Sequence, residues 1–265
     1  MIRTATPIRI YTQDEFHQID RIVTGQAFAI HNELGRILDE RLYQRELAAR
    51  CLKAGLSVHR EMKIVVSHED FAKEYFVDLL VADGVIVEAK TAQILNGEHT
   101  GQTLNYMFLC DTQHGTLLNF RPTSVQHEFV STTLTSDERR RFTLHTEGWR
   151  PMGAEWERLR EVMEALLKNW GAFLEPHLYR DALTHFLGGA GNVIRKIPVT
   201  TENGVIGEQE MRLLSPTTAF AVTAATRKPG QMKDHLRRFL QHTPLEAMAW
   251  INLDRHDIEL RSITR

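Results

Sequence analysis

Two β-rich runs around a three-residue turn constrain the fold more than any other feature of this sequence. The segment EYFVDLLVADGVIVEAK, residues 74–90, carries ADG at residues 82–84 between the runs. Asp-Gly is a preferred hairpin turn, and alternating β-branched residues on both sides favour paired strands. A three-residue loop closed by Val81 and Val85 predicts an antiparallel hairpin in a defined register.

This register places Asp78 opposite Glu88, with Cβ atoms about 5 Å apart. Glu88 and Lys90 are two residues apart, so their side chains leave the strand on the same face. Adjacent buried carboxylates repel unless a positive group lies between them. Hard oxygen ligands suit Mg²⁺ or Mn²⁺. We therefore expect Asp78 and Glu88 to bind a divalent metal ion.

Lys90 beside such a metal ion would orient or activate the attacking water and offset phosphate charge. The alternative is a solvated hairpin whose charged residues form a simple cross-strand cluster. Asp78 argues against this alternative, because it lies within the apolar run YFVDLLV, where an ionised group needs a partner.

The remaining first-half segments predict a small mixed β-sheet flanked by helices. Apolar periodicity and breakers predict helices and strands in alternation. The expected helices are residues 15–34, 39–52 and 100–109, and the further expected strands are residues 58–67 and 115–120.

Two helical positions bring polar groups toward the expected site. Glu40 shares a helix face with Tyr43 and is a candidate third metal ligand, although a surface glutamate is an equal interpretation of the spacing. Gln102 and Tyr106 are four residues apart on the later helix, hence on one face, and could contact phosphate or the leaving group.

The second half repeats the first in outline. FLEPHLYRDAL at residues 173–183 parallels ILDERLYQREL at residues 37–47, and similar matches follow in order as GNVIRKIPV, FAVTAAT and AMAWINL. Residues 131–150 have the composition of a linker. We therefore predict a first α/β domain at 1–130, a linker at 131–150 and a tandem repeat of the same fold at 151–265. A shared helix–strand rhythm without duplication is the alternative.

The second copy is expected to be catalytically inactive. FAVTAAT lies where VIVEAKT lies in the first copy, with Thr223 and Ala225 in the places of Glu88 and Lys90. A basic cluster nearby either contacts phosphates or forms an ordinary solvated helix face. Its members, the candidate nucleic-acid-binding residues, are Arg227, Lys228, Lys233, Arg237 and Arg238.

Five motifs between residues 15 and 130 resemble those of the GxxExxY proteins, a branch of the PD-(D/E)XK nuclease superfamily. They are HNELGRILDERLY, VDLLV, VIVEAK, GQTLNYM and GTLLNF. The resemblance implies Glu40 as the helix acid, Asp78 and Glu88 as metal ligands, and Lys90 as the catalytic lysine. Gln102 and Tyr106 resemble the QxxxY element of RecB-like nucleases. Ile37 departs from the pattern, because it stands where the family usually has glycine.

Composition excludes several other classes. The two cysteines are too few for a disulfide framework, and the start of the chain lacks the apolar core of a signal peptide, so a cytoplasmic location is expected. No apolar run reaches the roughly 20 residues that a membrane span needs. Neither GxGxxG nor GxxxxGK[ST] occurs, which argues against an enzyme acting on a small phosphorylated metabolite.

The expected function is metal-dependent hydrolysis of phosphodiester bonds, with DNA as the expected substrate and RNA left open. A net charge of -2 gives no global signature of nucleic-acid binding, so any contact would come from a local patch. The alternative is a non-catalytic nucleic-acid-binding or assembly protein that retains a nuclease-like fold.

Overall fold

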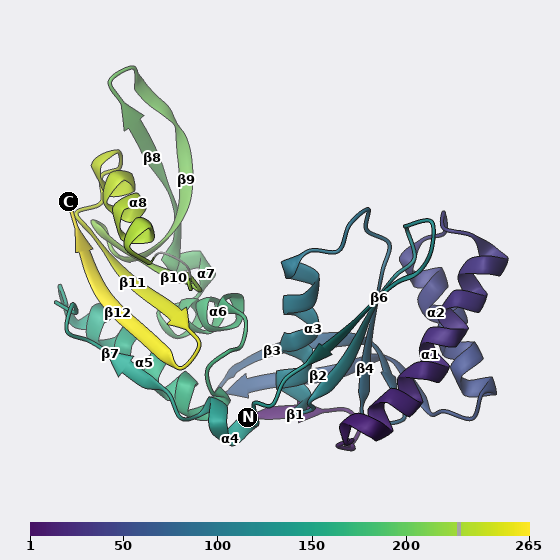
Figure 1. Ribbon diagram of the computed structural model, residues 1–265. Coiled ribbons are helices and arrows are strands. Elements are labelled where there is room, and N and C mark those ends of the chain that lie inside the picture. The colour runs from purple at the N-terminus through teal and green to yellow at the C-terminus, as the bar shows by residue number, and fades with distance from the viewer. Residues whose placement is uncertain (227–228) are drawn as a thin grey trace. The chain divides into compact units, whose positions relative to one another are not determined.

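The computed structural model describes residues 1–226 and 229–265, which form two compact units (Figure 1). The first unit comprises Met1–Ser67 and Ala72–Ser136, and the second comprises His68–Phe71 and Asp137–Arg265. Each unit is described by itself below.

The first unit is a mixed sheet flanked by helices, as the sequence predicts. Its strands follow the order β1-β2-β3-β4-β5-β6, with β4 and β5 parallel and the β1–β2, β3–β4 and β5–β6 pairs antiparallel. The elements are β1 (Ile2–Thr4), α1 (Gln13–Leu34), α2 (Glu40–Lys53), β2 (Val58–His68), β3 (Phe71–Val81), β4 (Val85–Lys90), α3 (Gly97–Cys110), β5 (His114–Asn119) and β6 (Gln126–Ser131).

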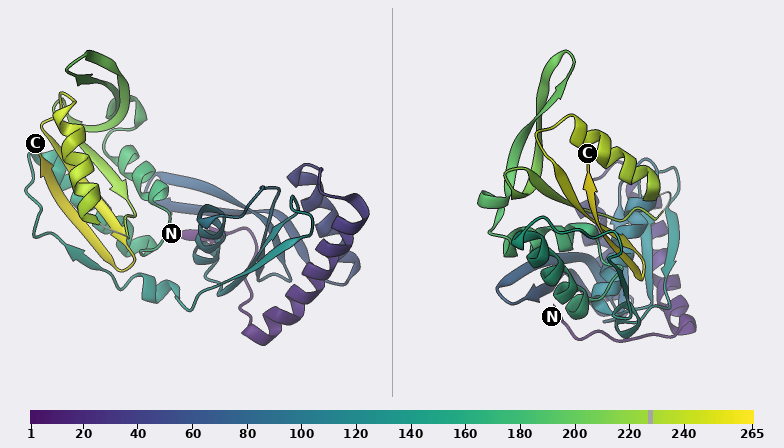
Figure 2. Two further views of the ribbon diagram at one scale, coloured as in Figure 1. Left: turned by 45° about the horizontal axis from the view of Figure 1, so that its top comes forward. Right: turned by 90° about the vertical axis from the view of Figure 1, so that its left-hand side faces the viewer.

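Helices α1 and α2 lie on one side of this sheet and α3 lies on the other (Figures 1 and 2). Thr12 begins α1 with a capping box that includes Glu15, and Gly35 ends the helix at a φ of 73°. The main core of the unit lies between α1, α2 and the sheet. It includes Val23, Ile30, Tyr43, Leu47, Leu79, Val81, Val85, Val87, Ala89 and Leu118.

The β3–β4 hairpin has the register that the turn chemistry predicts. The paired positions are Leu79 with Val87, Leu80 with Ile86 and Val81 with Val85. In the loop, Ala82 and Asp83 have positive φ values of 51° and 59°. A Cβ atom at Gly84 would collide with the Arg9 carbonyl and lie 2.8 Å from the Tyr11 ring, so only glycine fits there.

The second unit is also built on a mixed sheet, in the order β7-β12-β11-β10-β9-β8. β10 and β11 are parallel, and the β8–β9, β9–β10 and β11–β12 pairs are antiparallel. Its elements are α4 (Ser136–Arg139), β7 (Thr143–His145), α5 (Ala154–Trp170), α6 (Pro176–Phe186), α7 (Ala190–Val193), β8 (Ile194–Thr201), β9 (Gly204–Ser215), β10 (Thr218–Thr223), α8 (Pro229–Gln241), β11 (Ala247–Asp254) and β12 (Asp257–Thr264).

The described elements of the two units follow the same order. Apart from the short helices α4 and α7, two helices precede three neighbouring strands in each unit, and a helix then leads to a strand parallel to the third, followed by an antiparallel strand. The short edge strands differ, because β1 pairs with β2 and β7 pairs with β12. A detail recurs at the corner between the first two helices. The Tyr43 hydroxyl donates a hydrogen bond to the Gly35 carbonyl at 2.6 Å, and the Tyr179 hydroxyl donates to the Gly171 carbonyl. Each tyrosine follows its glycine by eight residues.

The segment predicted as a linker, residues 131–150, contributes structure to the second unit. It contains all of α4 and all of β7, and β7 pairs in parallel with β12. The division between the units falls between Ser136 and Asp137. β7 has only three residues, which is enough to extend the edge of the sheet. A strand this short shows no clear apolar alternation, so the sequence pattern does not predict it.

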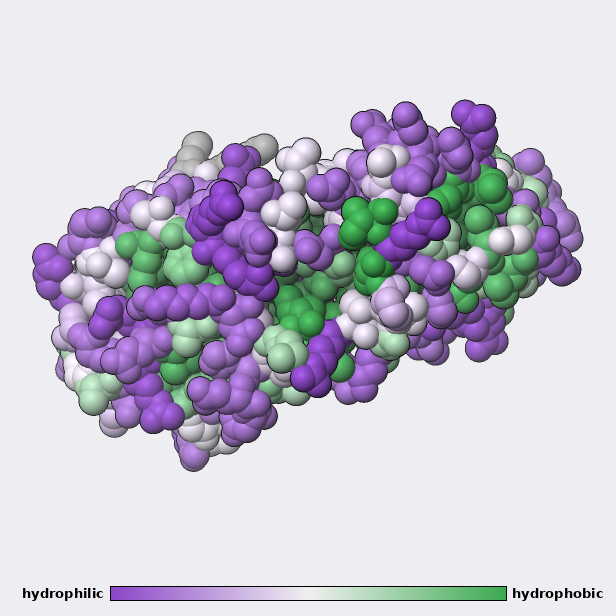
Figure 3. Space-filling view, turned by 90° about the horizontal axis from the view of Figure 1, so that it is seen from below, coloured by the Kyte–Doolittle hydropathy of each residue, from purple (hydrophilic) through white to green (hydrophobic). Residues whose placement is uncertain are grey.

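Hydrophilic residues cover most of the face in Figure 3, with apolar patches among them. Within the described part of the chain, no helix combines the length and the apolar character needed to cross a bilayer.

Candidate active site

Alternation along β3 and β4 places three charged side chains on the face of the sheet that lies toward α3. Val85, Val87 and Ala89 belong to the core under α1 and α2. Because side chains alternate along a strand, Glu88 and Lys90 must leave the opposite face. Asp78 is next to Leu79, which also lies in that core, so Asp78 leaves on the same side as Glu88.

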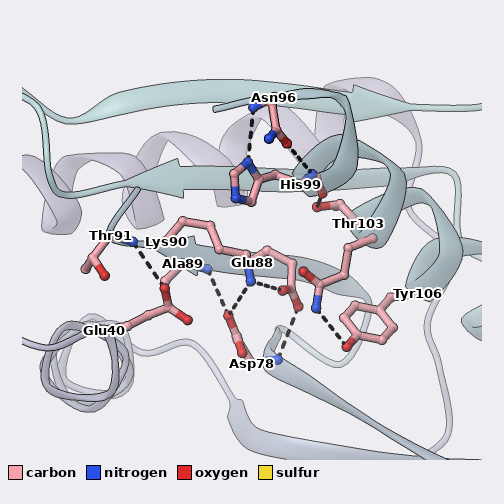
Figure 4. A network of polar contacts seen from close by, with 11 residues as sticks. Glu40, Asp78, Glu88, Ala89, Lys90, Thr91, Asn96, His99, Thr103 and Tyr106 are labelled. Carbon is pink, nitrogen blue, oxygen red and sulfur yellow. Dashed lines mark hydrogen bonds and ion pairs between the residues drawn. The ribbon is translucent and has the colours of Figure 1, made fainter. Parts of the chain in front are cut away.

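The three charged groups make direct contacts (Figure 4). Lys90 Nζ lies 3.1 Å from Glu88 Oε2 and 3.9 Å from Asp78 Oδ2. The backbone N–H of Asp78 donates to Glu88 Oε1 at 3.3 Å, and the backbone N–H of Ala89 donates to Asp78 Oδ2 at 3.1 Å. Side chains therefore link β3 and β4 next to the last paired position, Leu79 with Val87.

Burial controls the protonation of these groups. The Glu88 side chain is 0% exposed, and burial together with the charge of Asp78 raises its pKa to about 8. Burial also raises the pKa of Asp78, against the opposing charge of Lys90. For Lys90, burial lowers the pKa, but the charges of Glu88, Asp78 and Glu40 outweigh it, so the net pKa is raised. Lys90 therefore carries its proton at neutral pH.

Glu40 reaches the same edge of the sheet from the first residue of α2. Its Oε2 accepts a hydrogen bond from the backbone N–H of Thr91 at 3.1 Å, directly after Lys90. Burial raises the pKa of Glu40, and the charge of Lys90 opposes this. Ile37, which stands where the family pattern has glycine, is 81% exposed in the loop before α2, and its φ is not positive. The loop thus accommodates a side chain without strain.

Gln102 and Tyr106 lie together on α3, as their spacing predicts. Gln102 Nε2 donates to the Tyr106 hydroxyl at 3.1 Å. Burial raises the pKa of Tyr106, so the phenol keeps its proton. The charges of Glu88 and Asp78 also raise this pKa, which places the ring within electrostatic reach of both carboxylates.

Two supporting residues were not identified from the sequence. Gln44 is buried one helical turn after Glu40, and its side chain makes a hydrogen bond that lowers the pKa of Asp78. Asn119 accepts from the backbone N–H of Ala92 at 3.1 Å and donates to the Ala92 carbonyl at 2.8 Å. Gln44 could have been found from its i, i+4 spacing from Glu40, which places both side chains on one face of α2.

The donor set fits a metal held by two carboxylates. Asp78 and Glu88 offer hard oxygens at one point, and Mg²⁺ usually takes one or two protein carboxylates with water and substrate completing its sphere. No group of three or more His, Cys, Asp or Glu side chains within residues 1–226 and 229–265 is arranged to hold a metal ion. Glu40 accepts from the Thr91 backbone, and its role as a third metal ligand stays a prediction.

The site combines a hairpin, which presents Asp, Glu and Lys on one face, with a neighbouring helix that carries Gln and Tyr. Residues 17–131 match the model of the PD-(D/E)XK nuclease superfamily. No curated protein and no solved structure gives a significant match. The superfamily match covers most of the first unit. The narrower assignment to the GxxExxY branch stays a prediction.

In the second unit, strand pairing identifies the residue that stands where the first unit has Lys90. Lys90 pairs with Asn119 across β4 and β5, and Thr223 pairs with Asn252 across β10 and β11. Asn252 Oδ1 accepts from the backbone N–H of Ala225 at 2.7 Å, as Asn119 does from Ala92. Thr223 thus occupies the position of Lys90.

This register corrects the alignment made from the sequence, which placed Thr223 and Ala225 at the positions of Glu88 and Lys90. Glu88 pairs with Leu117, and Ala221 pairs with Trp250, so Ala221 occupies the position of Glu88. The motifs FAVTAAT and VIVEAKT look alike in more than one register, and strand pairing decides between them.

The basic cluster is only partly described. Arg227 and Lys228 lie outside the described residues. Lys233 is paired with Glu259 at 3.0 Å and lies over the Trp250 ring. Arg237 is exposed and lies 3.5 Å from Asp234, and Arg238 is exposed in the last turn of α8.

Proposed function

We propose that the first unit hydrolyses phosphodiester bonds of nucleic acid, DNA in the first instance, with the aid of Mg²⁺ or Mn²⁺. The observation that carries this proposal is the convergence of Asp78, Glu88 and Lys90 on one face of the β3–β4 hairpin. The superfamily match over residues 17–131 supports the same reaction class.

Asp78 and Glu88 would hold the metal ion in this proposal. A divalent cation there supplies Lewis acidity toward the phosphate and lowers the pKa of a bound water. Both carboxylates must be ionised to bind it, and a cation between them would relieve the repulsion and burial that raise their pKa values.

Lys90 acts as a cationic donor and not as a proton acceptor, because its raised pKa keeps it protonated. Its ammonium group can orient the attacking water and offset the negative charge that develops on the phosphate oxygens. Glu88 positions this ammonium through the contact at 3.1 Å.

Glu40 and the α3 pair complete the site. Glu40 fixes the backbone after Lys90 by accepting from the Thr91 N–H. The protonated Tyr106 phenol and the exposed Gln102 amide can donate hydrogen bonds to phosphate or to the leaving oxygen.

We further propose that residues 151–265 arose by tandem duplication of the first fold and lack catalytic activity. Three observations support this: the shared order of elements, the Tyr–Gly hydrogen bond at each helix corner, and the Asn–Ala contacts after each parallel strand pair. In the second unit Ala221 and Thr223 stand where the first unit has Glu88 and Lys90, and Ala221 packs against an apolar core that includes Trp250.

The rival proposal is a non-catalytic nucleic-acid-binding or assembly protein that keeps the fold. The decisive test incubates purified protein with labelled single-stranded and double-stranded DNA and RNA, in Mg²⁺, Mn²⁺ or EDTA. Cleavage that requires metal and is lost in Glu88→Gln supports the nuclease. Binding without cleavage under every condition supports the rival.

A further inference from the structure

His99, in the first turn of α3, has one ring nitrogen committed to the protein. The backbone N–H of Asn96 donates to His99 Nδ1 at 3.0 Å, and the Asn96 side chain in turn accepts from the backbone of His99 at 3.3 Å. A ring nitrogen that accepts a hydrogen bond carries no proton, so the proton of the neutral imidazole lies on Nε2. The capping contact therefore makes Nε2 a hydrogen-bond donor.

This donor faces the catalytic cluster. Figure 4 shows the ring nitrogen opposite Asn96 turned toward the side on which Lys90 and Glu40 lie. A protonated His99 would lower the pKa of Glu40, so the two side chains lie within electrostatic reach of each other. No acceptor for Nε2 stands among the residues that the structure describes, although the ring is half-buried.

A phosphate bound at the acidic cluster would require such a hydrogen-bond donor. A phosphate that approaches Asp78, Glu88 and Glu40 meets three carboxylates, and the Lys90 ammonium is already shared between Glu88 and Asp78. Additional donors must satisfy the remaining phosphate oxygens, because a desolvated anion without partners is costly.

We propose that His99 donates a hydrogen bond from Nε2 to a phosphate oxygen of the bound nucleic acid strand. His99 is then a substrate-binding residue whose tautomer is set by Asn96. This inference rests on the proposed function, because it takes the nucleic acid as the ligand of the site.

Two substitutions separate this role from simple helix capping. The side-chain oxygen of asparagine can take the place of histidine Nδ1. His99→Asn can therefore keep the contact with the Asn96 N–H, and it loses only the Nε2 donor. Glutamine reaches the place of Nε2, so His99→Gln keeps a donor toward the site and loses the capping contact. A purely structural role predicts the reverse order of effects.

The experiment measures the affinity of wild type and both variants for a fluorescein-labelled single-stranded DNA oligonucleotide, in EDTA and in Mg²⁺, and their thermal stability. We expect His99→Asn to weaken binding by about tenfold, the size of one hydrogen bond to a charged group, and His99→Gln to bind almost as wild type. Unchanged affinity in His99→Asn, or equal weakening in both variants, overturns the inference.

Cleavage is measured in parallel, so that the two proposals can fail separately. If the wild type binds with the expected variant pattern but does not cleave, the nuclease assignment fails and the role of His99 stands. If it cleaves while His99→Asn binds and cleaves normally, the role of His99 fails alone. A wild type that binds no oligonucleotide overturns both.

Discussion

The backbone N–H of Asp78 donates a hydrogen bond to the Glu88 carboxylate at 3.3 Å, next to the strand pair of Leu79 with Val87. The two acidic residues are thus joined through a backbone group, and their charges are balanced by Lys90 on the same face. Burial nevertheless raises the pKa of both carboxyl groups, that of Glu88 to about 8.

Lys90→Met removes the ammonium group and keeps the length of the side chain. We expect cleavage to fall roughly 100-fold or more, because a charged donor toward the transition state is lost. The control is Lys63→Met, at a partly exposed lysine of β2 that is paired with Glu74. Circular dichroism checks folding, and wild-type cleavage by folded Lys90→Met contradicts the assignment.

The metal-free protein should lose stability as pH rises from about 4.5 to about 8. Glu88 binds its proton more tightly in the folded state, with a pKa of about 8 against the usual 4.5 of a glutamate side chain. Within this window the folded state holds more protons than the unfolded state, so the free energy of unfolding falls by about 1 kcal/mol per pH unit. Denaturant titrations in EDTA measure this slope, and Glu88→Gln should flatten it. An identical slope in the variant would show that other groups control it.

Tyr43→Phe and Tyr179→Phe should each destabilise their own unit by about 1–3 kcal/mol. Each removes a buried hydroxyl and leaves a glycine carbonyl, Gly35 or Gly171, without its partner. Hydrogen exchange resolves the two units separately. Equal losses are expected if the two helix corners are equivalent, whereas a loss in only one variant would weaken the duplication proposal.

Replacing the basic cluster by alanine should weaken nucleic-acid binding for all sequences alike. If its residues contact phosphates, the dependence of affinity on salt should flatten by about one slope unit per contact removed. Arg237→Ala with Arg238→Ala should account for more of this effect than Lys233→Ala, because Lys233 is already paired with Glu259. An unchanged salt slope would reduce the second unit to a structural role.

Much of the candidate site follows from local sequence rules. The Asp-Gly turn and the alternation along β3 and β4 predict the register, and the register places Asp78 opposite Glu88 and Lys90 on the same face. These signals act over a few residues, where turn geometry and side-chain direction leave few alternatives. The i, i+4 spacing likewise brings Gln102 to Tyr106.

Only the tertiary structure decided how distant segments complete the site. Glu40 contacts the backbone of Thr91, and Gln44 reaches Asp78 from the same helix. Strand pairing placed Thr223 at the position of Lys90, where the sequence alone favoured another register. The short strands β1 and β7 also form through partners far along the chain. Sequence patterns fix which face of an element is apolar, but the packing of whole elements fixes which residues meet, because many distant pairings satisfy the same local pattern.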